Sequence, residues 1–285
     1  MNMRPLGETS VSAIGLGAMP MSVHGHMPDE AQSIRTIHAA LDAGVTLIDT
    51  ADAYTPTSDQ AGHNERLVAE ALASWGGDTS RVLVATKGGH TRTPGDGWDV
   101  DGRPEYLVEA CERSLKALGV EAIGLYQHHR PDPAVPYEET IGALRDLLDA
   151  GKIRMAGISN ANPSQIRLAY QVLDGRLASV QNEYSPRFRT SEPEIDLCEE
   201  LGVAFLPWSP LGGMSSAGQL GSKHAAFGRV AQARGVSPQQ VCLAWELARS
   251  PVVIPIPGAS RPETILDSVA ATDLTLTPEE LKSLD

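Results

Sequence analysis

The sequence predicts an α/β fold, a single (β/α)8 barrel of the TIM type with an N-terminal β-hairpin, which spans residues 1–285 as one domain. Two observations predict it. Short apolar runs rich in β-branched residues alternate with longer amphipathic segments, which is typical of parallel strands joined by helices. A length of 285 residues is also usual for one such barrel.

Each element is expected at a definite place in the chain. The hairpin is expected at residues 4–13. The barrel strands are expected at residues 14–17, 45–48, 82–86, 122–126, 153–158, 179–181, 203–208 and 252–256. The helices are expected at residues 30–43, 63–75, 104–118, 137–150, 163–172, 192–201, 237–249 and 262–271. The third helix has the clearest signals, because Pro104 suits a first helical turn and Gly119 a left-handed C-cap.

Three predicted connections are longer than usual, at residues 53–62, 88–103 and 211–224. Each follows the C-terminal end of a predicted strand, where barrels of this type place their binding sites. We therefore expect these loops to form the wall and lid of a pocket.

Composition and charge exclude several classes of function. The chain has 41% hydrophobic and 21% charged residues and no apolar stretch long enough to span a bilayer, and its first residues lack the apolar core of a signal peptide. We expect a cytoplasmic protein without membrane contact. A net charge of −13 without a basic patch disfavours nucleic-acid binding. The widely spaced Cys111, Cys198 and Cys242 are expected to be core residues in a reducing compartment, not zinc ligands.

Polar side chains follow three consecutive predicted strands. Asp49 and Tyr54 follow the second strand, Lys87 follows the third and His129 the fourth. The ends of parallel strands meet at one edge, so these side chains are expected in one pocket. A lysine ammonium would lower the pKa of a nearby tyrosine from about 10, a carboxylate would hold the lysine, and a neutral histidine could bind a carbonyl oxygen.

Each of these residues also has an ordinary alternative role. Asp49 could cap a turn, Lys87 could extend along the strand end to solvent, and Tyr54 could be a core residue with a satisfied hydroxyl. Their occurrence together at the ends of adjacent strands favours a proton donor for carbonyl chemistry.

The segments that carry these residues resemble the signatures of the aldo-keto reductase superfamily. They are residues 49–54 (Asp-Thr-Ala-Asp-Ala-Tyr), 85–88 (Ala-Thr-Lys-Gly) and 125–129 (Leu-Tyr-Gln-His-His). Residues 157–160, 181–184, 208–212 and 256–261 resemble the family's cofactor segments in the same order. The short C-terminus is similar to that of bacterial members which resemble potassium-channel β subunits. The resemblance implies that Asp49, Tyr54, Lys87 and His129, rather than His128, are the catalytic tetrad of a nicotinamide-dependent carbonyl reductase.

The resemblance also implies a set of cofactor-binding residues: Gly17, Met19, Asp49, Ser159, Asn160, Gln181, Tyr184, Ser209, Pro210, Leu211, Gly213, Gly258, Ser260, Arg261, Thr264 and Ser268. The polar groups at 159, 160 and 181 suit a carboxamide, Tyr184 offers a face for a nicotinamide ring, and backbone N–H groups near 209–213 suit a pyrophosphate.

Arg261, before a predicted helix, could bind the 2′-phosphate and select NADPH (NADP+) over NADH. Thr264 and Ser268 stand where the family often has arginine or glutamine and asparagine, so weaker contacts to the adenosine half are expected. Tyr54, Trp98 and His129 are expected to contact the substrate.

These interpretations predict the reversible, NADPH-dependent reduction of a small-molecule aldehyde or ketone, with hydride from the nicotinamide and a proton from Tyr54. Two alternatives remain: a cofactor-sensing binding protein with little turnover, and a Schiff-base lyase that uses Lys87. A dinucleotide fingerprint at Gly15-Leu16-Gly17 is disfavoured, because Pro20 stands where its third glycine would be. His24 and His26 lack partner ligands on later strands, so no metal site is predicted.

Overall fold

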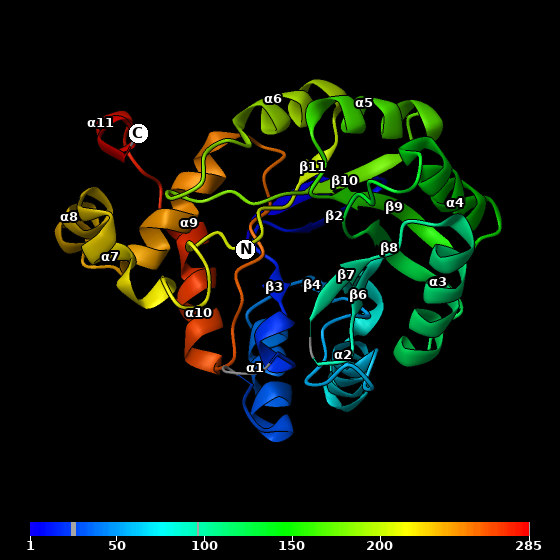
Figure 1. The fold of residues 1–285 in the computed structure, drawn as a ribbon. Helices are drawn as coiled ribbons and strands as arrows, with labels where there is room; N and C mark the ends of the chain where they lie inside the picture. The colour runs from blue at the N-terminus through cyan, green and yellow to red at the C-terminus, as the bar shows by residue number, and fades with distance from the viewer. Residues whose placement is uncertain (24–26, 96, 285) are drawn as a thin grey trace.

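Seven parallel strands form the central sheet, which curls into a half-barrel with helices on its outer side (Figure 1). The structure is a computed structural model that describes residues 1–23, 27–95 and 97–284. Sheet neighbours follow chain order, as sequential strand-helix units require. The strands are β3 (Leu16–Gly17), β4 (Leu47–Asp49), β5 (Leu83–Gly88), β8 (Ile123–His128), β9 (Ile153–Ser159), β10 (Leu177–Gln181) and β11 (Ala204–Phe205).

The helices expected from the sequence are all present, with ends that differ by a few residues. Pro104 begins the third and Gly119 ends it in a left-handed conformation, as predicted. A capping box between Asn162 and Gln165 begins the fifth. The helices are α1 (Glu30–Asp42), α2 (His63–Ser74), α3 (Pro104–Leu118), α4 (Tyr137–Asp149), α5 (Pro163–Val172), α6 (Glu192–Leu201), α9 (Pro238–Arg249) and α10 (Pro262–Ala270).

The eighth predicted strand, residues 252–256, is not a regular ladder strand. Pro255 and Pro257 have no N–H to donate, so this run makes only isolated bridges to its neighbours. Their carbonyl oxygens still accept bonds from the N–H groups of Gly15 and Gly17, at 2.9 and 3.0 Å, and Ile254 pairs with Phe205 on the other side. The run therefore joins the first strand to the seventh, consistent with the predicted (β/α)8 barrel.

The predicted N-terminal hairpin is also present, as β1 (Met3–Leu6) and β2 (Thr9–Ser12), which pair antiparallel. Leu6 and Val11 are buried in one cluster with inward-facing strand residues. Arg4 donates hydrogen bonds of 2.5–2.6 Å to the carbonyl oxygens of Leu247, Ser250 and Val253. The hairpin thus fixes the C-terminal end of α9 and the start of the eighth run, since it supplies donors to carbonyls that lack helical partners.

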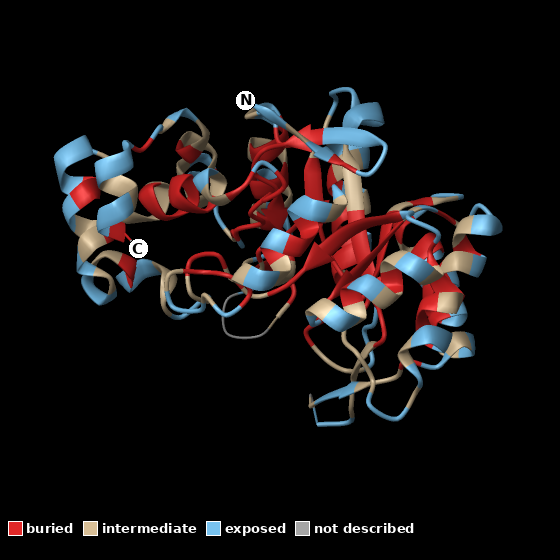
Figure 2. Cartoon of the chain, turned by 90° about the horizontal axis from the view of Figure 1, so that it is seen from above, coloured by how far each residue is buried: buried red, intermediate tan, exposed pale blue. Residues whose placement is uncertain are grey.

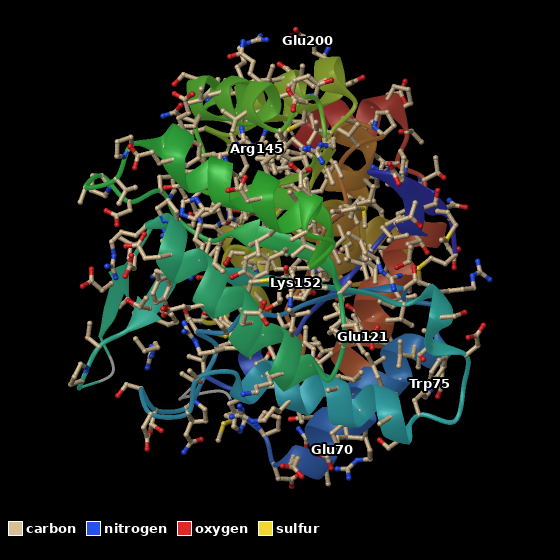
Figure 3. The ribbon with its side chains drawn as sticks, turned by 90° about the vertical axis from the view of Figure 1, so that its right-hand side faces the viewer. Glu70, Trp75, Glu121, Arg145, Lys152 and Glu200 are labelled. Carbon is tan, nitrogen blue, oxygen red and sulfur yellow. The ribbon has the colours of Figure 1, made fainter. Side chains whose placement is uncertain are left out.

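Strand residues alternate between an inner and an outer apolar layer. Leu47 of β4 packs inside with Leu6 and Ile254, whereas Ile48 packs outside with residues of α1 and α2. Figure 2 shows buried strands at the centre and helices around them that carry both buried and exposed residues. Side chains such as Glu70, Arg145 and Glu200 project from the outer faces of these helices (Figure 3). Residue parity therefore decides which polar groups face the inside of the sheet.

Several elements were not expected. The predicted loop 88–103 contains a second hairpin, β6 (His90–Arg92) with β7 (Trp98–Val100), and the predicted loop 211–224 contains the short α7 (Leu220–Lys223). Helix α8 (Ala225–Arg234) follows directly, and α11 (Pro278–Leu284) closes the described chain. The three cysteines are buried, as predicted. None of the described helices combines the length and apolar character needed to cross a bilayer.

Candidate active site

Strand parity turns Asp49 and Lys87 toward each other. Leu47 and Ala85 belong to the inner apolar cluster, so Asp49 and Lys87, two residues further along β4 and β5, face the same side. Thr86, which lies between Ala85 and Lys87 in β5, faces outward and donates a 2.6 Å hydrogen bond to Glu65 of α2. Both charged groups lie deep inside the protein, with Asp49 only 3% exposed and Lys87 fully buried.

Parity also separates the two adjacent histidines of the fourth barrel strand. His128 points outward and its ring packs against Tyr137 of α4 at 5.7 Å, whereas the His129 ring lies edge-on to Tyr54 at 5.7 Å. The backbone N–H of His129 donates to the carbonyl oxygen of Gly88 at 2.9 Å, which fixes the residue beside the end of β5. The structure therefore brings His129, and not His128, together with Tyr54.

The Lys87 ammonium is the centre of a buried hydrogen-bond network. It donates to Asp49 at 2.6 Å, to the carbonyl oxygen of Thr50 at 2.8 Å and to the hydroxyl oxygen of Tyr54 at 3.2 Å. Its three protons are thus all engaged. Because Lys87 donates to the phenol oxygen, the phenol proton is left to be donated elsewhere.

The buried environment sets the protonation of the network. Burial lowers the pKa of Lys87, but the charges of Asp49 and Tyr54 and their hydrogen bonds raise it, and the net pKa lies above its ordinary value. Burial raises the pKa of Tyr54 above 10, and Lys87 opposes this only in part. The charge of Lys87 acts in the direction expected from the sequence, but burial outweighs it. Burial and nearby cations hold the pKa of His129 well below 6.5, so its ring is neutral.

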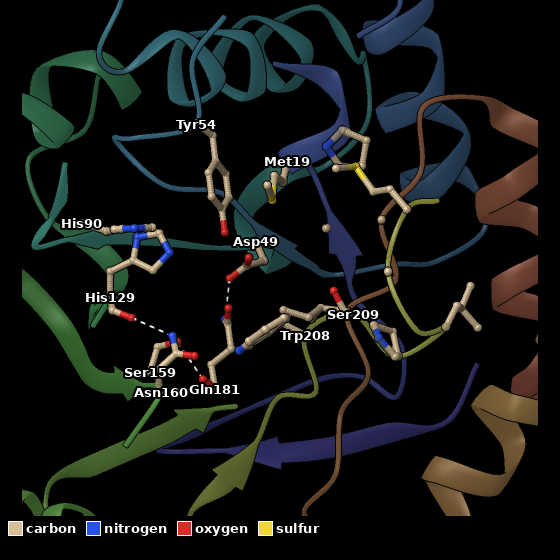
Figure 4. A pocket seen from close by; sticks show the side chains of 18 of the residues that line it. Met19, Asp49, Tyr54, His90, His129, Ser159, Asn160, Gln181, Trp208 and Ser209 are labelled. Carbon is tan, nitrogen blue, oxygen red and sulfur yellow. Dashed lines mark hydrogen bonds between the residues drawn. The ribbon is translucent and has the colours of Figure 1, made fainter. Parts of the chain in front are cut away.

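Amide side chains extend the network across the sheet (Figure 4). Gln181 at the end of β10 donates to the second Asp49 oxygen at 2.8 Å, and Gln127 donates to the same oxygen at 3.5 Å. Asn160 donates to the His129 carbonyl oxygen at 3.0 Å and to Ser159 at 2.9 Å. Residues of five strand ends are therefore held in one arrangement.

Two pocket residues have a left-handed backbone without being glycine. They are Asn160, with φ of 58°, and Ser209, with φ of 52°. Such conformations cost about 1–3 kcal/mol and cluster at binding sites. Beyond β11, Ser209 and the glycines after it leave the backbone accessible. A Cβ atom at Gly213 would meet nothing within 4 Å.

A cavity of about 510 Å³ opens above these groups. Most of the residues predicted from the sequence line it: Gly17, Met19, Asp49, Tyr54, Trp98, His129, Ser159, Asn160, Gln181, Ser209, Pro210, Leu211, Gly213 and Gly258. Residues from all three long predicted loops are among the lining residues, as expected for a pocket wall.

Six predicted residues do not line the cavity. Lys87 lies behind Tyr54 and Asp49. Tyr184 is fully buried and stacks on Trp245 at 5.2 Å. Arg261 is exposed at the start of α10, next to Ser260. Thr264 and Ser268 lie within α10, where the buried Ser268 hydroxyl donates to the Thr264 carbonyl oxygen at 3.1 Å.

Seven other lining residues were not predicted as site residues: Pro20, His90, Arg130, Trp208, Met214, Ala217 and Ile256. His90 stacks on Trp98 at 4.5 Å in the unpredicted hairpin. Trp208 and Met214 line the cavity on the side of β11. The buried indole nitrogen of Trp208 has no hydrogen-bond partner among the described residues. Arg130 follows His129 directly. Position alone could have indicated Trp208 and Arg130, since each adjoins a predicted site residue.

No metal centre is formed by the described residues: within 1–23, 27–95 and 97–284, no three His, Cys, Asp or Glu side chains are grouped as ligands. His24 and His26, the HxH pair in the sequence, lie outside the described residues.

Comparisons with known proteins show which family this chain resembles. An uncharacterised oxidoreductase of Schizosaccharomyces pombe is 33% identical over 283 residues, covering 98% of this chain and 88% of its own. The structure of a glycerol dehydrogenase from Gluconobacter oxydans is 30% identical, with a TM-score of 0.85 over 99% of this chain and 94% of that one.

Two structures from Klebsiella pneumoniae are each 30% identical, with TM-scores of 0.81 over 100% of this chain and 95% of theirs. One is an aldo/keto reductase in complex with NADP and acetate, and the other an aldo-keto reductase in complex with NADPH. The aldo/keto reductase family model matches residues 13–285. The chain therefore belongs to the aldo/keto reductase family.

Proposed function

We propose that this protein catalyses the reversible, NADPH-dependent reduction of an aldehyde or ketone to the alcohol. The observation that carries the proposal is the chain of contacts from Asp49 through Lys87 to the Tyr54 oxygen, at 2.6 and 3.2 Å, at the floor of a cavity. A buried phenol that keeps its own proton and receives a hydrogen bond from an ammonium is suited to donate a proton to a carbonyl oxygen.

The pocket fits a nicotinamide cofactor. The amides of Asn160 and Gln181 and the Ser159 hydroxyl face one part of it, and glycine backbone lies open near Ser209. We assign the face for the nicotinamide ring to Trp208, since it lines the cavity and Tyr184 does not. When bound, NADPH supplies the hydride. The NADP and NADPH complexes of the Klebsiella relatives support this choice of cofactor.

The side chains divide the acid chemistry among them. Neutral His129, beside Tyr54, donates one ring N–H hydrogen bond to the carbonyl oxygen and so orients it. Tyr54 gives its proton to that oxygen, and the phenolate that develops is stabilised by the Lys87 ammonium at 3.2 Å. Asp49 keeps Lys87 charged throughout. In alcohol oxidation the same groups act in reverse.

The geometry disfavours a Schiff-base lyase. A lysine nucleophile must be neutral and must reach the substrate, but Lys87 is fully buried, does not line the cavity and has a raised pKa. A cofactor-sensing binding protein would use the same pocket, and turnover distinguishes it: bound NADPH without carbonyl reduction would favour that alternative.

The test is Tyr54→Phe with a panel of aldehydes and ketones and NADPH oxidation as the readout. We expect NADPH to bind with nearly unchanged affinity and turnover to fall by at least a hundredfold, within the usual contribution of a general acid. Tyr170→Phe on α5, away from the cavity, is the matched control and should behave as wild type. Turnover above a tenth of the wild-type value in Tyr54→Phe would reject Tyr54 as the acid, since the barrier would have risen by less than about 1.4 kcal/mol.

A further inference from the structure

Arg130 places a positive charge in the wall of the proposed active site. It follows His129 at the C-terminal end of β8 and lines the same cavity as Tyr54, His129 and Trp98. It is partly buried, which reduces the screening of its charge by water. None of the proposed catalytic steps uses it.

The guanidinium of Arg130 is not neutralised by the protein. Among the described residues, no carboxylate lies within 4.0 Å of it, and it donates no hydrogen bond. Asp49, the acid that lines the cavity, is already bonded to Lys87 and Gln181. Burial raises the pKa of Glu183, and the charges of Arg187 and then of Arg130 lower it by less. A partly buried arginine of this kind has donors available for a ligand.

The field of Arg130 reaches the position of the substrate. Burial has the largest influence on the pKa of Tyr54, His90 and His129, and the charge of Arg130 acts on all three. His90, with its pKa lowered to about 4, and His129 are neutral near pH 7. They therefore add no positive charge, and among the described residues that line the cavity Arg130 is the one lysine or arginine, in a chain whose net charge is −13.

The position of Arg130 points to the substrate rather than to the cofactor phosphates. Ser209 and Gly213, where backbone is open for a pyrophosphate, follow β11, and Arg261 lies at the start of α10. Strands β9 and β10 separate β8 from β11 in the sheet. Arg130 instead adjoins His129, the residue assigned to the carbonyl oxygen.

On the basis of the proposed function, we propose that the substrate carries an anionic group, a carboxylate or a phosphate, which Arg130 binds while the carbonyl faces Tyr54 and His129. The planar guanidinium fork suits both kinds of oxyanion. Apolar lining residues such as Trp98 and Met214 would contact the carbon chain between the two polar ends. Arg130 is thus a specificity-determining residue, distinct from the tetrad.

The test compares pairs of substrates in which one member carries an anionic group and the other does not. The pairs are 4-oxobutanoate with its methyl ester, and D-glyceraldehyde 3-phosphate with D-glyceraldehyde, each assayed with NADPH. For at least one pair we expect wild type to favour the anion by about tenfold to a hundredfold in kcat/KM, the usual value of a charge-assisted hydrogen bond. Arg130→Gln should bring that ratio close to one. The pair that responds identifies carboxylate or phosphate.

Arg167→Gln is the matched control, because this arginine of α5 is exposed and pairs with Glu200 outside the pocket. It should keep the wild-type ratio. The inference is overturned if wild type shows no anion preference in either pair, or if Arg130→Gln keeps the preference. It is equally overturned if Arg130→Gln weakens NADPH binding and leaves the ratio unchanged, which would assign Arg130 to a cofactor phosphate.

A binding measurement separates this inference from the proposed function. Calorimetry with butanoate and butanamide, with and without NADP+, needs no turnover. If no carbonyl compound is reduced, the proposed function fails, yet tighter binding of butanoate that is lost in Arg130→Gln would still support the anion site. Equal binding of both compounds to wild type would reject a carboxylate site whatever the activity.

Discussion

At the scale of single residues, strand parity explains which predictions of the sequence hold. Asp49 and Lys87 stand two positions after inward-facing Leu47 and Ala85, so the pattern alone could place them in one pocket. The alternation of side-chain direction holds only within a strand and does not predict the orientation of residues beyond its end. Tyr184, three residues after Gln181, was expected to stack on a nicotinamide ring, but it packs in the core against Trp245. Trp208 lines the cavity instead, as its position directly before the predicted Ser209 could have indicated.

A residue-scale prediction concerns the choice of cofactor. Arg261 is exposed at the first turn of α10, where both its charge and the helix N-terminus favour an anion. Arg261→Ala should weaken the binding of NADPH by about tenfold to a hundredfold and leave the binding of NADH nearly unchanged. The two cofactors differ only in the 2′-phosphate.

Quenching of tryptophan fluorescence during titration with each cofactor measures this difference. Arg229→Ala, an exposed arginine of α8, is the control and should alter neither affinity. An equal loss for NADPH and NADH would place Arg261 away from the 2′-phosphate and remove a main argument for NADPH preference.

At the scale of elements, the sequence predicts helices with a wide apolar face and misses weaker ones. Only Phe227, Val230 and Ala231 of α8 are buried, too few to give a recognisable stripe. The hairpin of β6 and β7 has three residues in each strand and lies in a glycine-containing stretch, so it has no alternating pattern. Its stability comes from backbone pairing and from the stacking of His90 on Trp98. That hairpin supplies part of the pocket wall, which is why sequence reasoning located the loop but not its structure.

The long helix α9 contains a buried acid that should limit stability at neutral pH. Glu246 is fully buried and neither carboxyl oxygen has a hydrogen-bond partner among the described residues. Burial raises its pKa well above 4.5. The folded state therefore keeps the proton that the unfolded chain releases above pH 4.5, so the contribution of Glu246 to stability is most favourable at low pH and becomes less so as the pH rises.

Glu246→Gln should remove this dependence. Near pH 4 the variant and wild type should unfold at similar urea concentrations. Above that pH the free energy of unfolding of the variant should rise relative to wild type by up to about 1.4 kcal/mol for each pH unit, until the buried acid of the wild type ionises. Glu70→Gln, an exposed acid of α2, is the control and should show no such gain. A constant difference between Glu246→Gln and wild type from pH 4 to 8 would contradict the assignment.

At the scale of the whole molecule, counting strands predicted a closed barrel but not how it closes. Seven runs pair as ladder strands, whereas the eighth contains Pro255, is followed by Pro257 and contributes mainly carbonyl acceptors. The composition of residues 252–257 shows the prolines, but the partners of their carbonyls are set by distant residues such as Gly15 and Gly17. Such long-range pairing leaves no local signal in the sequence. Closure also brings Gly17 and Gly258 together at the edge of the cavity.

Gly17 is where this closure can be tested. A Cβ atom there would lie 2.8 Å from the carbonyl oxygen of Ile256, a backbone atom that cannot rotate away. Gly17→Ala should force the first strand away from the eighth run, stretch the bond from the Gly17 N–H to Pro257 and lower the free energy of unfolding by about 1–3 kcal/mol, as overpacking usually does.

Urea unfolding followed by circular dichroism measures the effect. Gly218→Ala is the matched control, because a Cβ at Gly218 meets nothing within 4 Å and its φ is not positive, so its stability should stay within about 0.5 kcal/mol of wild type. If Gly17→Ala were as stable as Gly218→Ala, the first and eighth runs could separate freely. The half-barrel of seven ladder strands would then be stable without their contact, and closure would serve the cavity rather than the fold.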